Sequence, residues 1–289
     1  EKFDVIHAET FYVMPHIPKT KIPIILVEQT IEYRVYQHFV NNLSFIFKPF
    51  FYLDILKLKF WERFYWKQAN IVAAVSKTDE EIIKKLESKI KTVIIPNGAG
   101  DEMIVKKIPK KNLKKPVLLF QGNFYWLQNL EAAKFLVKKI YPLLKKTFPE
   151  AKIIISGQKA SKIKAKKNIE IIDLKLSQTK LVKEIYKKAT LFVAPIFGPG
   201  GTRLKILAAM ASGIPVISTT TGVEGLMVKD KINVILAKNA SDFVENIKIV
   251  LNNKSLYQKI QKNAYQLIKK YYHWPAIAKK LKNIYKEMI

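Results

Sequence analysis

The sequence has 289 residues, and its 51 lysines and arginines against 23 aspartates and glutamates give a formal net charge of +28 at pH 7. It contains no cysteine, which excludes disulfides and cysteine-ligated metals, and no apolar run reaches the ~20 residues of a membrane span. Hydrophobic residues make up 49% of the chain, enough for packed cores and too many for a disordered protein.

The positive charge has two explanations. A large positive charge is typical of proteins that bind nucleic acid, anionic lipid or phosphorylated substrates. However, only three of the cationic residues are arginines, and the lysines are spread along every helical segment. We favour a general lysine bias with solvated helix faces, and weak affinity for an anionic membrane is the main functional alternative.

The chain begins without methionine and without a basic leader or hydrophobic stretch. We therefore expect no signal peptide, and a fragment or processed form of a longer protein. Two short apolar runs, 4–8 and 22–27, predict buried strands. His7 and Glu28 lie at the C-terminal ends of these strands, where ligands bind in open α/β sheets, so both are candidates for an acceptor-side site. A structural role is the alternative for His7.

Residues 39–68 are rich in aromatic side chains. Pro49 interrupts the segment, and the remainder has the spacing of an amphipathic helix with lysine and arginine between apolar positions. We favour a helix packed on a sheet with lysine stems at its edge. The alternative is a helix that lies in a membrane interface.

The next elements complete the first half. We predict strands at 70–75 and 92–95, with a helix from Ser76 or Thr78 to about residue 88 between them. A tight turn follows at 96–98. The lysine- and proline-rich segment 106–116 lacks hydrophobic periodicity and is the expected linker.

A second alternating series follows the linker and predicts another parallel sheet. The expected strands are 117–120, 152–156, 169–172, 191–196, 215–218, 225–228 and 233–236. The expected helices are 129–146, 177–188, one beginning at about Thr202, 241–251, 255–271 and a final basic helix after Trp274.

Glycines gather in residues 191–226, which hold six of the ten in the chain. Here a strand is followed by a glycine-rich turn and a helix start, the arrangement that binds phosphate through backbone N–H groups. Arg203 and Lys205 add two cations to the turn. Gly122 and Gly157 also follow strands of this series, which suits a backbone that approaches a ligand closely, although each could be an ordinary turn glycine.

Three segments carry a family resemblance: IPNG at 95–98, FQGNFYWLQN at 120–129, and GPGGTRLKILAAMASGIPVISTTTGVEGL at 198–226. They resemble the GT4 family of retaining glycosyltransferases (glycosyl transferases group 1), in the branch of exopolysaccharide-type sugar transferases. The resemblance implies an α/β GT-B fold of two Rossmann-like domains with parallel sheets. Residues 1–108 would be an incomplete acceptor-side domain and 109–273 the nucleotide-sugar donor domain, with helix 274–289 packing back on the first.

The resemblance also assigns residues to a donor site. Gly200 and Gly201 would donate backbone N–H groups to the donor diphosphate, next to Thr202. Arg203 and Lys205 would be catalytic by stabilising the charge of the leaving nucleoside diphosphate. The remaining donor-binding residues would be Gly122, Asn123, Gly157, Ala208 and Glu224. No metal site and no cofactor beyond the nucleotide-sugar co-substrate are implied.

The chain departs from the family pattern at three points. Ala208 stands where the family has a glutamate for the ribose hydroxyls, a loss of about 1–3 kcal/mol by analogy with lost hydrogen bonds to charged groups. Gly200 stands where the family has a partner glutamate, although this branch commonly lacks it. We expect the family's first strand and its glycine-rich loop to be missing from this sequence.

The expected function is therefore transfer of a sugar from a nucleotide-diphosphate sugar to a glycan or lipid-linked acceptor, with retention, in bacterial cell-envelope polysaccharide synthesis. The expected location is the cytoplasm or, peripherally, the inner face of the cell membrane. Ala208 and the short N-terminus support a catalytically impaired nucleotide-sugar-binding protein as the alternative. A nucleic-acid-binding protein rests only on the charge, since no recognition motif is present, and no nucleic-acid partner is expected.

Overall fold

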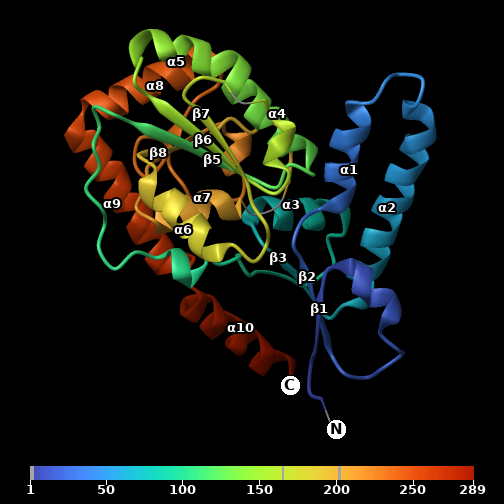
Figure 1. The fold of residues 1–289 in the computed structure, drawn as a ribbon. Coiled ribbons are helices and arrows are strands. Elements are labelled where there is room, and N and C mark those ends of the chain that lie inside the picture. Colours follow the sequence, from blue (N-terminus) through green and yellow to red (C-terminus); the bar gives the residue numbers. More distant parts are fainter. Residues whose placement is uncertain (1–2, 165, 201–202) are drawn as a thin grey trace.

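A computed structural model describes residues 3–164, 166–200 and 203–289. It has two parallel β-sheets, each flanked by helices and joined by an irregular crossing segment (Figure 1). The first sheet has the order β1-β2-β3-β4, and the second has the order β10-β9-β8-β5-β6-β7. The expected α/β fold with two parallel sheets is confirmed.

The first sheet is built from short apolar runs. Its strands are β1 (Ile6–Glu9), β2 (Ile24–Glu28), β3 (Ile71–Ala74) and β4 (Thr92–Ile94). One face is covered by η1 (Phe11–His16), α2 (Lys48–Gln68) and α3 (Lys77–Leu86), with Trp66 and Ile83 in the core. α1 (Glu32–Asn41) packs beside α2. Ser76 begins α3, because its hydroxyl accepts a hydrogen bond from the N–H of Asp79 at 3.1 Å.

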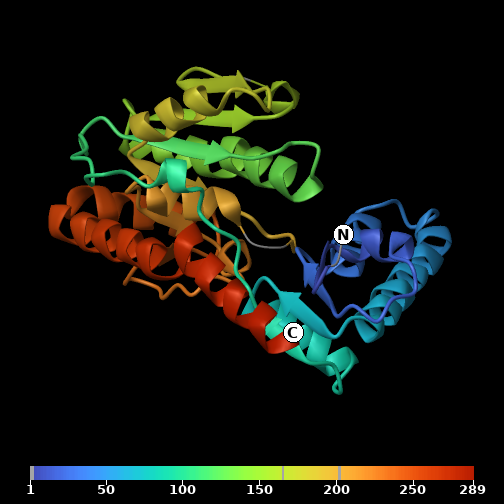
Figure 2. The same ribbon diagram turned by 90° about the horizontal axis from the view of Figure 1, so that it is seen from below.

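The other face of the first sheet is covered by the last helix, α10 (Trp274–Met288). Ile277 and Ile284 of α10 share a core with Ile25 and Ile71. Figure 2 shows α10 continuing from the helices of the second sheet to the first sheet. The C-terminal helix therefore connects both parts of the fold.

The second sheet is larger and carries most of the hydrophobic core. Its strands are β5 (Val117–Gln121), β6 (Lys152–Gly157), β7 (Ile169–Asp173), β8 (Leu191–Ala194), β9 (Val216–Ser218) and β10 (Ile235–Leu236). The helices are α4 (Leu127–Phe135), which runs through a π-helical turn (Leu136–Ile140) into α5 (Tyr141–Thr147), α6 (Thr179–Lys188), α7 (Leu204–Ala211), α8 (Ala240–Asn252) and α9 (Lys254–Tyr271). Strands β5 and β8 are buried throughout their centres, as expected for parallel strands covered on both faces.

The expected strand at 225–228 is wrong. Leu226 and Val228 alternate as in a strand, but Gly225 has a φ of +81°, which turns the backbone. The N–H of Leu226 bonds back to Val223 and that of Val228 bonds to Leu226, so this segment forms consecutive tight turns. A short 3₁₀ helix (Thr221–Val223) precedes it.

Two other segments differ from their predicted boundaries. The aromatic segment 39–68 is divided between α1 and α2, which are joined by a loop at 42–47. The crossing segment includes a 3₁₀ turn, η2 (Asp101–Met103), and Ala99 and Met103 already pack in the core around the second sheet. Residues 106–116 form neither helix nor strand.

Candidate active site

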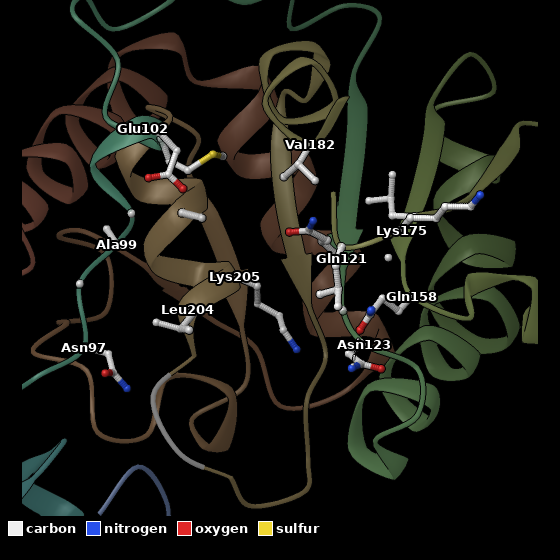
Figure 3. Close-up of a pocket in the computed structure, with 18 of the residues that line it drawn as sticks. Asn97, Ala99, Glu102, Gln121, Asn123, Gln158, Lys175, Val182, Leu204 and Lys205 are labelled. Carbon is white, nitrogen blue, oxygen red and sulfur yellow. Dashed lines mark hydrogen bonds between the residues drawn. The ribbon is translucent and has the colours of Figure 1, made fainter. Parts of the chain in front are cut away.

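A pocket of ≈570 Å³ opens at the carboxyl ends of β5 and β6, next to the start of α7. Asn97, Gly98 and Gly100 of the crossing segment form its opposite wall, together with Trp274. Figure 3 shows Lys205 extending from α7 into this pocket, toward the turn that carries Asn123. The pocket therefore lies where open parallel sheets bind ligands.

A second pocket of ≈360 Å³ adjoins the first, and both are lined by Asn97, Asn123 and Lys205. Gln29 and Thr30 follow β2 of the first sheet and line this second pocket, opposite Arg203. The two pockets thus form one cleft that passes from the second sheet to the edge of the first.

Gly157 allows the ends of β5 and β6 to approach each other. Its φ is +138°, and a Cβ at this position would lie 1.8 Å from the carbonyl oxygen of Gly122. This contact requires glycine at residue 157. The sequence predicts that this glycine lets the backbone approach a ligand; the close contact that the structure shows is with the end of the neighbouring strand, and ligand approach stays a prediction.

Arg203 is buried at the mouth of the glycine-rich turn, with 5% of its surface exposed. Its Nη2 donates to the carbonyl oxygen of Gly198 at 2.7 Å, while its Nε has no hydrogen-bond partner within the described part of the chain. Burial lowers the pKa of Arg203 to about 10. Since a buried charge without full hydrogen bonding is costly, the guanidinium is suited to receive an anion.

Lys205 lies two residues after Arg203, in the first turn of α7, and is half-buried between this helix and β5. Its ammonium donates to Oδ1 of Asn129 and lies 5.7 Å from the centre of the Phe120 ring. Burial, and then the charge of Arg203, lower the pKa of Lys205 to about 7. The ammonium therefore loses its proton near neutral pH unless a negative charge enters the cleft.

The carboxylates near this pair are already engaged. Asp79 accepts a hydrogen bond from Oγ of Ser76 at 2.6 Å, and Glu224 pairs with Arg34 at 3.8 Å. Both act on Arg203 at longer range and oppose the lowering of its pKa. Positive charge in the cleft is thus only partly compensated by protein groups.

The residues expected at the donor site are distributed as follows. Five line the larger pocket: Gly122, Asn123, Gly157, Lys205 and Ala208. Gly200 and Arg203 line the smaller one. Gly201 and Thr202 lie outside the described residues, and α7 begins at Leu204. Glu224 lines neither of these two pockets, because it faces Arg34 in a small space beside Gly200.

The structure does not support an acceptor role for Glu28. Only 1% of its surface is exposed, and its Oε1 accepts a hydrogen bond from Nε1 of Trp66 at 2.8 Å. Burial, together with the nearby Glu62, holds the pKa of Glu28 well above its usual range. A carboxyl group in the core below α2 cannot contact an acceptor.

His7 also lies outside both pockets, but it connects to them. Its ring nitrogens bond to the Tyr285 hydroxyl at 2.5 Å and to Oε1 of Glu9 at 2.9 Å. Gln29 donates to Glu9 at 2.6 Å and accepts from Asn97 at 2.8 Å. His7 is therefore one member of a chain of hydrogen bonds that runs from Tyr285 of α10 to Asn97 in the cleft.

Several lining residues were not predicted. Gln121 and Asn129 flank Gly122 and Asn123 within the motif at 120–129, so their place in that motif was an available signal. Glu102 and Trp274 come from distant segments, and no local pattern identifies them. Glu102 is the one carboxylate among the described residues that line the larger pocket, and Ala208 lines the same pocket.

Comparisons with known proteins identify the second half of the chain. Residues 115–253 match the family model described as Glycosyl transferases group 1. The match supports a glycosyl transferases group 1 domain over these residues. A 44.6 kDa protein in the cps region of Klebsiella pneumoniae is 24% identical over 284 residues, which cover 94% of this chain and 71% of that protein.

Solved structures show the fold of the whole chain. Sucrose-phosphate synthase of Thermosynechococcus elongatus aligns with a TM-score of 0.74 at 15% identity, over 99% of this chain and 74% of that one. Anabaena HepE in complex with UDP and glucose aligns with a TM-score of 0.67 at 12% identity, over 98% of this chain and 77% of that one. The expected GT-B fold is confirmed. GT4 membership and the retaining outcome remain predictions.

Proposed function

We propose that the chain transfers a sugar from a nucleotide-diphosphate sugar to a glycan or lipid-linked acceptor in polysaccharide synthesis. The observation that carries this proposal is the pair of cations, buried Arg203 and half-buried Lys205, at the carboxyl end of a parallel sheet. Their lowered pKa values indicate a site whose charge is completed by an anionic ligand. The cps-region relative supports polysaccharide synthesis, and HepE with UDP and glucose supports the ligand class.

The proposed donor pose follows from the shape and polarity of the cleft. The diphosphate would lie against Arg203 and Lys205, where the two pockets meet. The nucleoside would occupy the larger pocket between Gly122 and Trp274, and the sugar would extend toward Gln29 in the smaller one. The acceptor would then approach from the first sheet.

The cations would act on the bond that breaks. Cleavage between the anomeric carbon and the phosphate oxygen leaves both bonding electrons on the nucleoside diphosphate, whose negative charge grows in the transition state. Arg203 and Lys205, already fixed and partly desolvated, would stabilise that charge. In the retaining mechanism that the resemblance implies, the acceptor oxygen forms the new bond on the same face, and its proton passes to the departing phosphate oxygen.

A ligand panel tests this proposal. Thermal unfolding would be measured with pyrophosphate, nucleoside diphosphates and nucleotide sugars, and bound donors would then be incubated with lipid-linked and glycan acceptors. We expect one nucleoside diphosphate and its sugar to raise the melting temperature, and the sugar to be transferred. No shift with any ligand would contradict the donor site. Binding without transfer to any acceptor would favour the impaired binding protein that Ala208 suggests.

We further propose that Glu102 contacts the ribose in place of the glutamate that is absent at residue 208. Its carboxylate lies next to Gly100: a Cβ on that glycine would be 3.0 Å from Oε1 of Glu102. Because η2 packs against α7 and both Glu102 and Ala208 line the larger pocket, a carboxylate from η2 would face the ligand that Ala208 leaves without one.

Glu102→Gln should weaken nucleoside diphosphate binding about tenfold, because a hydrogen bond to a charged group is lost. Pyrophosphate binding should be unchanged, since it has no ribose. Titration calorimetry with both ligands measures the ratio, and Ala208→Glu in the Glu102→Gln background should restore it. Equal losses for both ligands would instead assign Glu102 to the phosphate site or to pocket stability.

A further inference from the structure

Helices α1 and α2, with their loop, form an antiparallel pair (residues 32–68) that we call the aromatic hairpin (Figure 1). Its inner side is firmly anchored. Oε1 and Oε2 of Glu62 accept hydrogen bonds from the N–H groups of Glu32 and Tyr33, at 2.7 and 3.1 Å. Trp66 bonds to Glu28 in the core. The two helices are therefore bonded to each other and joined to the core of the first sheet.

Its outer side is apolar and exposed. The exposed positions of α2 recur three and four residues apart, so they form one continuous stripe, which extends onto the loop. They include Phe45, Phe50, Leu53, Leu56, Phe60 and Phe64. Phe45 at the loop and Phe50 at the start of α2 are 78% and 74% exposed. Monomeric proteins in water rarely expose a contiguous apolar surface of this kind, which marks it as an interaction site.

The charge around the stripe identifies the partner. Lys57 lies within the stripe between Leu53 and Phe60 and pairs with Asp54 at 4.0 Å, while Lys67 pairs with Glu87 at 2.9 Å; the two lysine side chains are 74% and 55% exposed. The hairpin as a whole stays positive, because residues 32–68 hold six lysines and arginines against three aspartates and glutamates. Glu62 is buried, and burial raises its pKa to about 8, so it adds little negative charge at neutral pH. A second copy of this chain would bring another +28 to the contact and be repelled, whereas an anionic surface would attract it.

We propose that the aromatic hairpin docks on an anionic lipid bilayer, with its stripe inserted among the headgroups and acyl chains. Phenylalanine, tryptophan and lysine stems together suit this interface, since the rings enter the apolar layer and the ammonium groups remain with lipid phosphates. None of the helices in the described ranges is long and apolar enough to cross a bilayer, so the hairpin lies in its surface.

Docking would bring the cleft close to the bilayer. His38, at the end of α1, bonds to Glu131 of α4 at 3.1 Å. A Cβ on Gly198 would lie 2.7 Å from Nε2 of the same histidine, so the hairpin contacts the glycine-rich turn. Docking itself does not depend on the proposed function, because it requires neither donor nor acceptor.

Vesicle binding by the full chain tests the proposal. Co-flotation would compare vesicles of phosphatidylglycerol and phosphatidylcholine with vesicles of phosphatidylcholine alone. Phe45→Ser/Phe50→Ser should fold normally, because both side chains are largely exposed, and should bind anionic vesicles at least about tenfold more weakly. The matched control is Met227→Ser/Ile289→Ser, which removes two exposed apolar side chains outside the hairpin and should bind like the unmodified chain.

Insertion has a separate readout in tryptophan quenching. Trp61 is exposed on the hairpin, so bromine-labelled acyl chains should quench the unmodified protein more than Trp61→Phe. Equal binding by the serine variant and the unmodified chain would show attraction by lysines alone and overturn the proposal. So would equal binding to both vesicle types, or failure to bind by a chain that light scattering shows to be a dimer.

Discussion

Arg203→Ala should weaken pyrophosphate and nucleoside diphosphate binding by about 100-fold, because it removes a charged group that can donate more than one hydrogen bond to phosphate. The guanidinium is held in place by Gly198, and its Nε is unpaired within the described residues. The apo protein already bears the cost of burying this cation. The ligand therefore binds to a charge that is already in position, and removing the guanidinium should lower the affinity by the whole of its contribution.

Titration calorimetry with pyrophosphate measures the loss, and sugar transfer should fall at least as far. Arg203→Lys should recover part of the affinity through its charge, without the planar fork of donors. Arg63→Ala is the matched control, since Arg63 pairs with Glu87 on the outside of α2. If Arg203→Ala bound pyrophosphate within about threefold of the unmodified chain, Arg203 would have no role in holding the diphosphate.

The elements of the second sheet were predictable because a parallel strand covered on both faces requires an almost unbroken apolar run. Residues 117–120 and 191–194 are such runs, and both are fully or nearly fully buried. The same rule fails at 225–228, where apolar residues pack from a series of turns rather than a strand. The spacing of apolar residues indicates which side chains are buried, but it does not indicate whether the backbone forms a strand or a series of turns.

The phosphate side of the cleft was predictable for a related reason. Gly200, Arg203 and Lys205 lie within six residues, so one turn and one helix start place them together. Glu102, Gln29 and Trp274 reach the same cleft from the crossing segment, the first sheet and the start of α10. Their convergence depends on how the two sheets face each other, which no local pattern encodes.

Glu28 shows the same limit for a single side chain. Its position after an apolar strand predicted a carboxylate at the sheet edge, available to a ligand. The partner that allows its burial, Trp66, lies 38 residues later on α2. Likewise, the spacing of the aromatic segment predicts a helix packed on a sheet, and the structure confirms this for its inner side only.

Lys205→Met should have opposite effects on stability and on binding. The folded pKa of Lys205, about 7, lies below its ordinary value of 10.5, so the folded protein binds fewer protons than the unfolded chain between these two pH values. The lysine therefore destabilises the ligand-free protein below about pH 7, and this cost disappears as the pH rises toward 10.5. At pH 7 the free energy of unfolding of the methionine variant should be about 2 kcal/mol larger than that of the unmodified chain, after allowing for the lost bond to Asn129.

Binding should change in the other direction, because an incoming diphosphate favours the protonated lysine. Pyrophosphate affinity of the unmodified chain, taken relative to Lys205→Met, should fall about tenfold from pH 6 to pH 8. The ratio removes the titration of pyrophosphate itself, which affects both proteins alike. Chemical denaturation at pH 7 and pH 10 and calorimetry at pH 6 and pH 8 supply the four measurements. A variant less stable than the unmodified chain at pH 7 would show that burial of Lys205 does not destabilise the ligand-free protein. A binding ratio that does not vary with pH would show that protonated Lys205 does not bind the diphosphate.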